Sequence, residues 1–290
     1  MATEIPNVFR NMEQLRHLYL PPTYTVIEKL SFAALGNLQT LVNVRVEKCD
    51  LNGLVQLTNL KKLDIIIGSK KSGGYLEKLK DMLISRSITF NHLRSLSLTK
   101  EGVDCDEEHI ARDIVSSCPH LYKLRLDGND ENDLKFELPK EPLCYPNLTK
   151  ITLIRIKVKG EQIEILEKLP NLRVLYLCPR ESGKESMMVF SQGGFPHLET
   201  LSLIGLDSLK EWRVEKGAMP RLARLRIQGC WELKEVPEGV QDITSLKELT
   251  IDRMPSTFCW RVRKGGEDFY KIKHVPSLLI TNIWENDWRL

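Results

Sequence analysis

Cysteine and histidine are residue types that perform nucleophilic catalysis or bind metals. Cys118 and His120 stand two residues apart across a proline, but no base, orienting group or oxyanion turn accompanies them. His92, His120 and His197 each come immediately before the first leucine of a recurring pattern. Periodicity therefore explains these histidines, and neither catalysis nor metal binding follows from them.

Other groups that could carry chemistry also lack the required spacing. Residues 68–74 (GSKKSGG) do not match the GxxxxGK[ST] phosphate loop, so ATP binding is not expected. The acidic pairs Glu107-Glu108 and Glu267-Asp268 are interpreted as solvated charges. The cysteines include no CxxC pair, which favours reduced thiols over a disulfide framework or a zinc site; they are Cys49, Cys105, Cys118, Cys144, Cys178, Cys230 and Cys259. We expect no catalytic residue, no cofactor and no metal.

A leucine pattern recurs along the chain and predicts the elements that position the remaining side chains. The frame Leu-x-x-aliphatic-x-aliphatic recurs, from Leu121 onward, in steps of 24 to 27 residues. Such steps are typical of leucine-rich repeats, which span about 20–29 residues. Each repeat predicts a short strand, a turn and a returning segment, because one repeat alone cannot bury its leucines. The ten frames begin at Leu15, Leu41, Leu60, Leu93, Leu121, Leu148, Leu172, Leu198, Leu222 and Leu246.

Proline and cysteine also follow the period. Proline ends the preceding segment and delivers an extended chain to the next strand. In the turn after the strand, Cys49, Cys230 and Asn129 hold a position whose side chain can satisfy backbone groups. The prolines stand two residues before a frame, at Pro119, Pro146, Pro170, Pro196 and Pro220.

These features predict an α/β fold, a leucine-rich-repeat solenoid curved like a horseshoe with a parallel concave sheet. Residues 1–290 are expected to form one domain of about ten repeats, with mixed helical and extended segments on the convex side. Residues 107–118 and 161–169 are amphipathic and predict helices, whereas residues 231–246 predict a tighter, extended return. Residues 68–90 are interpreted as an inserted loop and helix, and residues from about 255 to 290 as a C-terminal cap.

The third and fifth places of each frame should point away from the leucines, because side chains alternate along a strand. This surface is the candidate binding site for a protein partner, since arginine and tyrosine are enriched at interface hot spots. The alternative for any single position is that its side chain is simply solvated and contacts no partner. The candidate partner-binding residues are Tyr19, Arg45, Lys62, Lys123, Arg125, Lys150, Tyr176, Arg224 and Arg226.

Composition limits the other functions. The net charge of +3 gives no strong attraction for nucleic acid or an anionic membrane. The sequence shows neither a leader peptide nor an apolar stretch long enough to span a membrane. We expect a cytoplasmic protein that binds no nucleic acid and does not span a membrane.

From residue 9 to residue 284, the chain resembles the leucine-rich-repeat domain of plant coiled-coil nucleotide-binding disease-resistance proteins. The stretches that carry the resemblance are MEQLRHLYLP near the start, SLKEWRVEKGAMPRLARLRIQGCWELKEVPEGVQDITSLKELTI, and GEDFYKIKHVPSL near the end. The resemblance implies that the repeats sense a pathogen effector or a modified host protein and restrain a nucleotide-binding region. The coiled coil and nucleotide-binding module are missing here, so we expect a fragment or a truncated gene product, without ATP/ADP switching in these residues.

Two other functions remain open. A substrate-receptor repeat domain of a ubiquitin ligase would need an F-box ahead of the repeats, and none is visible in the first 14 residues. An enzyme built on a repeat scaffold is disfavoured by the lack of catalytic motifs. The upstream reading frame would separate these alternatives.

Overall fold

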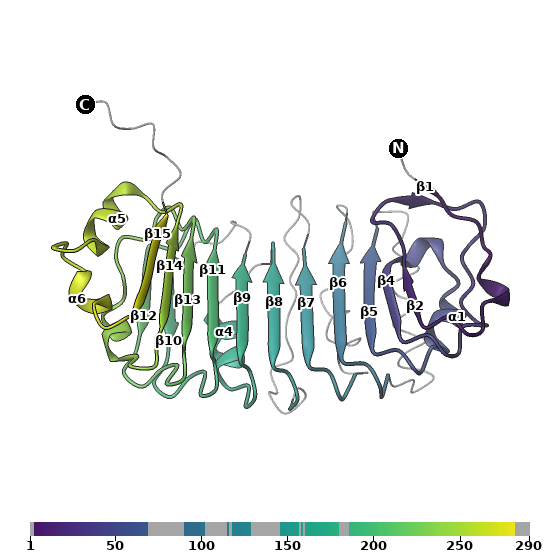
Figure 1. The fold of residues 1–290 in the computed structure, drawn as a ribbon, viewed down its shortest axis with the longest axis horizontal. Coiled ribbons are helices and arrows are strands. Elements are labelled where there is room, and N and C mark those ends of the chain that lie inside the picture. Colours follow the sequence, from purple (N-terminus) through teal and green to yellow (C-terminus); the bar gives the residue numbers. More distant parts are fainter. Residues whose placement is uncertain are drawn as a thin grey trace. The chain divides into compact units, whose positions relative to one another are not determined.

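The computed structural model describes residues 3–68, 90–101, 115, 118–128, 146–156, 158, 160–179 and 186–281. The chain divides into two compact units, Met1–Pro139 and Lys140–Leu290. Each unit is a solenoid of leucine-rich repeats built on a parallel sheet, which confirms the predicted fold class (Figure 1). The extent of the domain and its number of repeats stay predictions.

The first unit contains a parallel sheet in the order β2-β4-β5-β6-β7. Its strands are β2 (His17–Tyr19), β4 (Thr40–Arg45), β5 (Lys62–Ile67), β6 (Ser95–Lys100) and β7 (Lys123–Asp127). The other described elements are β1 (Thr3–Glu4) and β3 (Tyr24–Thr25), which pair with each other, the 3-10 helices η1 (Phe9–Asn11) and η2 (Val46–Lys48), and helix α1 (Leu51–Val55).

The second unit contains a parallel sheet in the order β8-β9-β11-β13-β14-β15. Its strands are β8 (Lys150–Ile154), β9 (Val174–Cys178), β11 (Thr200–Ile204), β13 (Arg224–Gln228), β14 (Glu248–Asp252) and β15 (Ser277–Thr281). The returning segments supply helix α4 (Gly160–Glu167), the strand pair β10 (Met187–Phe190) and β12 (Glu211–Val214), and the 3-10 helix η5 (Glu238–Asp242). Helices α5 (Ser256–Val262) and α6 (Phe269–Ile272) precede the last strand.

The aliphatic residues of the frames form the core of each unit. In the second unit Leu175, Leu201 and Leu225 lie in register on adjacent strands, and each is 2% exposed or less. The same register joins Leu63, Leu96 and Leu124 in the first unit. Phe190 packs edge-on against Phe195 and Trp212, with ring centroids 4.9 and 5.5 Å apart, and closes the side opposite the sheet. The stacking of repeats therefore buries the aliphatic side chains that a single repeat would leave exposed to solvent.

The residue just before each frame has a structural role. Asn59 and Asn171 donate side-chain hydrogen bonds to carbonyls of the preceding repeat, at 2.8 and 2.7 Å. His92, His120 and His197 occupy this same position, where they are exposed or half-buried. Their place in the repeat accounts for the three histidines, as the periodicity indicated.

The second frame begins at Leu38, so its predicted start at Leu41 is wrong. Thr40 pairs with His17 and Lys62, and the register then shifts between Leu41 and Val44. The shift is a β-bulge that contains Asn43 with a φ of 63°. Asparagine tolerates this left-handed backbone better than most residues. Leu41 fits the pattern better than Leu38 because the bulge displaces the third aliphatic residue of the frame from Leu38.

The returning segments agree with prediction where the structure describes them. Helix α4 confirms the helix expected over residues 161–169, although Ile165 is only half-buried. The tight return over 231–246 contains only the short helix η5. Of the helix expected over 107–118, only Val115 and Cys118 are described, and both are buried. The insertion at 69–89 and the turn residue Asn129 lie outside the described residues. The region expected to be a cap adds two helices and another repeat strand, β15.

Candidate functional site

The side of the strands that faces away from the leucines, called the strand face below, presents most of the candidate partner-binding residues. In the first unit Tyr19, Lys62, Lys123 and Arg125 are exposed on it, as the alternation predicted. In the second unit Lys150, Arg224 and Arg226 are exposed and Tyr176 is half-buried. The rigid leucine core positions these side chains at one strand spacing, about 4.8 Å, from repeat to repeat.

Arg45 is the exception, and its predicted place on the exposed surface is wrong. The bulge in β4 brings Arg45 opposite Ile66, and the residue is only 8% exposed. Its guanidinium lies 2.7 Å from Glu101 and 3.6 Å from Glu47, and it donates to the Pro22 carbonyl at 3.2 Å. Arg45 therefore acts within the fold of the first unit.

A row of polar side chains crosses the strand face of the first unit. Asp64, Ser97 and Arg125 occupy one register position on β5, β6 and β7. Burial raises the pKa of Asp64, and the neighbouring Ser97 hydroxyl and the charges of Arg125 and Lys62 offset part of this shift. Arg125 also forms an ion pair with Asp127 at 2.7 Å. Asp64 Oδ1 and Ser97 Oγ are buried, so Arg125 is the member of this row that a partner could reach.

The arginines on the strand face of the second unit are neutralised within the fold. Arg224 Nε lies 3.4 Å from Glu248 Oε2, and an Arg226 terminal nitrogen lies 3.4 Å from Asp252 Oδ2. Asp252 also accepts a hydrogen bond from the Thr281 hydroxyl at 2.9 Å. This part of the surface is therefore less basic than the frame positions alone indicated.

The C-terminal region contains a buried charge cluster that the sequence did not reveal. Asp268 is 1% exposed, so its interpretation as a solvated charge is wrong. It lies 3.0 Å from Lys271 Nζ and 2.9 Å from Arg261 Nε. Burial alone would raise the pKa of Asp268, but hydrogen bonds from Arg261 and Lys271 outweigh it and lower that pKa. Glu267 is 76% exposed, as expected, and contacts Arg261. Glu107 and Glu108 lie outside the described residues.

The described thiols are suited to a structural role. Burial raises the pKa of Cys49 to about 12 and that of Cys230 to about 11, which keeps both protonated. The Cys49 sulfur lies 3.7 Å from the Val46 carbonyl, and the Cys230 sulfur lies 3.6 Å from the Gln228 carbonyl. Both contacts agree with the predicted satisfaction of backbone groups in the turn.

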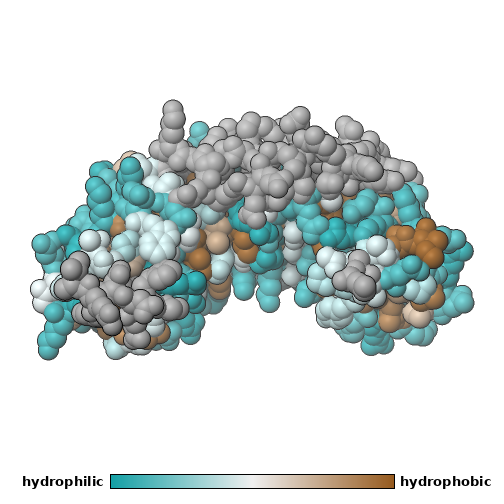
Figure 2. All heavy atoms as spheres, turned by 90° about the horizontal axis from the view of Figure 1, so that it is seen from above, coloured by the Kyte–Doolittle hydropathy of each residue, from teal (hydrophilic) through white to brown (hydrophobic). Residues whose placement is uncertain are grey.

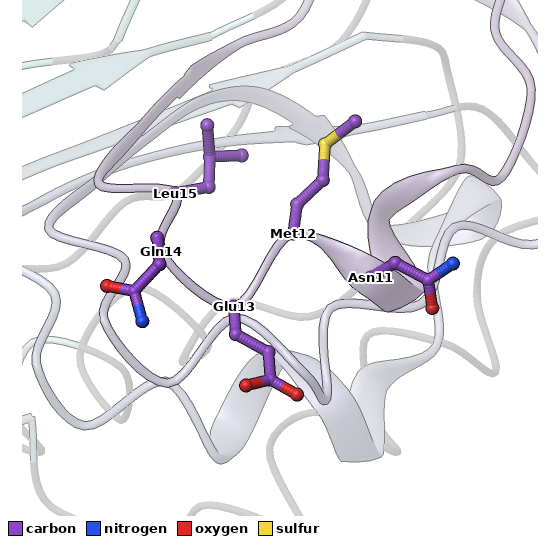
Figure 3. A pocket seen from close by; sticks show the side chains of 5 residues that line it. All are labelled: Asn11, Met12, Glu13, Gln14 and Leu15. Carbon is purple, nitrogen blue, oxygen red and sulfur yellow. The ribbon is translucent and has the colours of Figure 1, made fainter.

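Two shallow pockets lie away from the strand face. The first, of about 450 Å³, is lined by residues 11–15, and Met12 and Leu15 extend to one side of this turn while Glu13 extends to the other (Figure 3). The second, of about 590 Å³, includes Trp260, Gly265 and Glu267. The first lining contains no histidine, cysteine or lysine, and the only acid in the second is committed to Arg261. Neither arrangement provides a nucleophile with a base.

The visible surface is mainly hydrophilic, with separate hydrophobic patches (Figure 2). The most exposed large hydrophobic side chains among the described residues include Ile27 at 84%, Tyr19 at 63% and Trp260 at 63%. Within the described part of the chain, no helix is long and apolar enough to cross a membrane. The same residues contain no group of three His, Cys, Asp or Glu side chains that could hold a metal ion.

Comparison with known proteins gives consistent matches. The family described as leucine-rich repeat region matches residues 1–264. Probable disease resistance RPP8-like protein 2 of Arabidopsis thaliana is 34% identical over 288 residues, which cover 97% of this chain and 30% of the relative. Disease resistance protein RPP8 of the same plant is 33% identical over 280 residues, which cover 96% and 29%. The chain thus spans about 30% of the length of these curated relatives, and the matches confirm the resemblance indicated by the sequence motifs.

One solved structure, the functional domain of InlJ from Listeria monocytogenes, is 14% identical with a TM-score of 0.40. The match covers 97% of this chain and 62% of that chain.

Proposed function

Because the chain belongs to the leucine-rich repeat region family, we propose that it is the recognition and regulatory domain of an intracellular plant immune receptor. In this role it senses a pathogen effector or a modified host protein. It also restrains a nucleotide-binding module of the same receptor in the cytoplasm. The domain itself performs no catalysis and takes no cofactor.

The observation that carries this proposal is the similarity to disease-resistance proteins along almost the whole chain, 97% of it for the RPP8-like relative. The match occupies only 30% of that relative, which leaves room there for other modules. A domain that makes up about this share of a larger protein acts through the domains and proteins that it contacts. The strand face fits this role because it holds exposed tyrosine, arginine and lysine side chains on a rigid core.

The proposal can be tested in leaves with the nucleotide-binding region encoded upstream of these repeats. Expressed alone, that region should cause cell death, and co-expression of this chain should reduce it. A matched control is Leu201→Asp, which places a charge at a fully buried position and should unfold adjacent repeats. Equal cell death with the wild-type chain and with the control, at equal protein levels, would contradict the proposed restraint. An F-box in the upstream reading frame would also overturn it.

A further inference from the structure

Five cations at the start of the strands in the first unit form no ion pair with another described residue. These strand-start cations are Arg16, Lys61, Lys62, Arg94 and Lys123, and all five are exposed. The ion pairs among the described residues of this unit join Arg45 to Glu47 and Glu101, and Arg125 to Asp127. The strand-start cations therefore contrast with Arg224 and Arg226 in the second unit, which are both paired.

Backbone hydrogen bonds place the strand-start cations in two adjacent columns. The Lys61 N–H donates to the Gln39 carbonyl at 2.8 Å, and the Arg94 N–H donates to the Lys61 carbonyl at 2.9 Å. Gln39 in turn donates to Arg16, and Tyr122 donates to Arg94. This column thus crosses five consecutive repeats, or about 19 Å at the usual strand spacing.

The second column lies one residue further along each strand. Lys62, Ser95 and Lys123 share one register position on β5, β6 and β7. Two strand spacings separate Lys62 from Lys123, which is about 10 Å. Ser95 lies between them, so the two ammonium groups have room for an anionic group from a partner.

Few acids oppose these cations, and the nearby rings are already engaged. Within the described part of the unit, the acidic residues on the same turns and strands are Glu13, in the turn before β2, Asp64, on β5, and Asp127, at the end of β7, where it is paired with Arg125. The Arg94 guanidinium lies 5.6 Å from the Tyr122 ring centroid, and Lys62 Nζ lies 6.0 Å from that of Tyr19. Cation–π contacts hold the cations in place and occupy the ring faces on which nucleic-acid bases would stack.

We propose that the strand-start cations bind an extended acidic polypeptide segment that crosses the strands. In a polyproline-II segment, residues three apart share a face at about 9 Å, which approaches the separation of Lys62 and Lys123. Three acids with this spacing span about 19 Å, which matches the four strand spacings between the repeat of Arg16 and the repeat of Lys123. The inference rests on the proposed recognition function and names the chemistry of one partner surface.

The test uses the purified full chain and a labelled heptapeptide, Glu-Pro-Pro-Glu-Pro-Pro-Glu. Fluorescence anisotropy should show saturable binding at low salt that weakens as salt is added. The peptide with Gln in place of Glu should bind about tenfold more weakly. The combined variant Lys61→Glu, Lys62→Glu, Lys123→Glu should also lose about tenfold in affinity, with circular dichroism confirming its fold. If that variant is unfolded, the triple change to Gln takes its place.

A matched control carries the same change of charge on exposed lysines of the second unit that form no ion pair with another described residue: Lys216→Glu, Lys234→Glu and Lys247→Glu. This control should bind the acidic peptide as the wild type does. An equal loss in both triple variants would overturn the proposed site, and so would the absence of saturable binding by the wild type. Tighter binding of an eight-nucleotide single-stranded DNA than of the peptide would overturn the choice of a polypeptide. None of these outcomes tests whether the chain reduces cell death caused by the nucleotide-binding region. This experiment and the test of the proposed function can therefore fail independently of each other.

Discussion

Asp268 and Lys271 form an ion pair with 3.0 Å between Oδ1 and Nζ, and their side chains are only 1% and 3% exposed. Asp268 also accepts the Val236 N–H at 3.3 Å, and Lys271 donates to the Val236 carbonyl at 2.8 Å. The pair thus joins helix α6 to the returning segment of an earlier repeat. Both residues come from the GEDFYKIKHVPSL stretch, so a structural requirement explains part of that motif.

Asp268→Asn should destabilise the second unit by about 3 kcal/mol, because it leaves the Lys271 ammonium buried without its closest compensating charge. Urea denaturation measures this difference. Glu267→Gln is the matched control, because Glu267 is 76% exposed and an exposed pair contributes about 1 kcal/mol or less. Equal midpoints for the two variants would contradict a structural role for the buried pair.

The same carboxylate should make stability depend on pH in the acid range. Hydrogen bonds from Arg261 and Lys271 lower the folded-state pKa of Asp268 below 3.8. A lowered pKa contributes stability above the unfolded value, and this contribution disappears as the pH falls through the folded pKa. The unfolding free energies of the wild type and Asp268→Asn should therefore converge below about pH 4. A constant difference from neutral to acid pH would contradict this assignment.

Arg226→Glu should lower stability by about 1 kcal/mol, because it places a second carboxylate beside Asp252, whose side chain is 11% exposed. The expected loss is limited because Arg226 is 47% exposed and solvent screens its charge. Lys150→Glu reverses an exposed charge that forms no ion pair with another described residue, and it should change stability by less than about 0.5 kcal/mol. Thermal melting compares the two variants, and a smaller effect for Arg226→Glu would mean that the pair with Asp252 contributes nothing.

Gly239→Ala should destabilise the second unit, because the added Cβ would lie 1.9 Å from the Val214 carbonyl oxygen. That oxygen belongs to the backbone of β12, so relief requires η5 to move and costs about 1–3 kcal/mol. Gly160→Ala is the control, since nothing lies within 4 Å of its added Cβ. Differential scanning calorimetry should show a lower melting temperature for Gly239→Ala alone; unchanged melting of both variants would refute the close approach.

The leucine periodicity could predict most strands because burial in a stack of repeats demands an aliphatic residue at fixed intervals. It failed at Leu41, where the bulge at Asn43 places Val44 opposite Ile65, one residue later than a regular frame from Leu38 would require. It also missed β15, where Val275 replaces the first leucine. In both cases the tertiary register overrides the local pattern.

The candidate site was harder to predict from the sequence than the fold was. The rule for the third and fifth residues of each frame predicted correctly that Arg226 is exposed on the strand face. Its ion-pair partner Asp252 is the seventh residue of the next frame, a position that the rule does not include. The pattern could count charges on the strand face but not the pairs between repeats. Lys61 and Arg94, which form no ion pair with another described residue, are the second residues of their frames and stand just before the strands. The alternation of side chains within a strand therefore does not predict where they point.

The most direct test of the account measures binding between this chain and the nucleotide-binding region of its receptor by isothermal titration calorimetry. We expect saturable one-to-one binding that weakens with salt and is reduced by the Lys61, Lys62 and Lys123 charge reversals, but not by those at Lys216, Lys234 and Lys247. No heat of binding between two folded proteins at low salt would contradict the claim that these repeats contact and restrain that region.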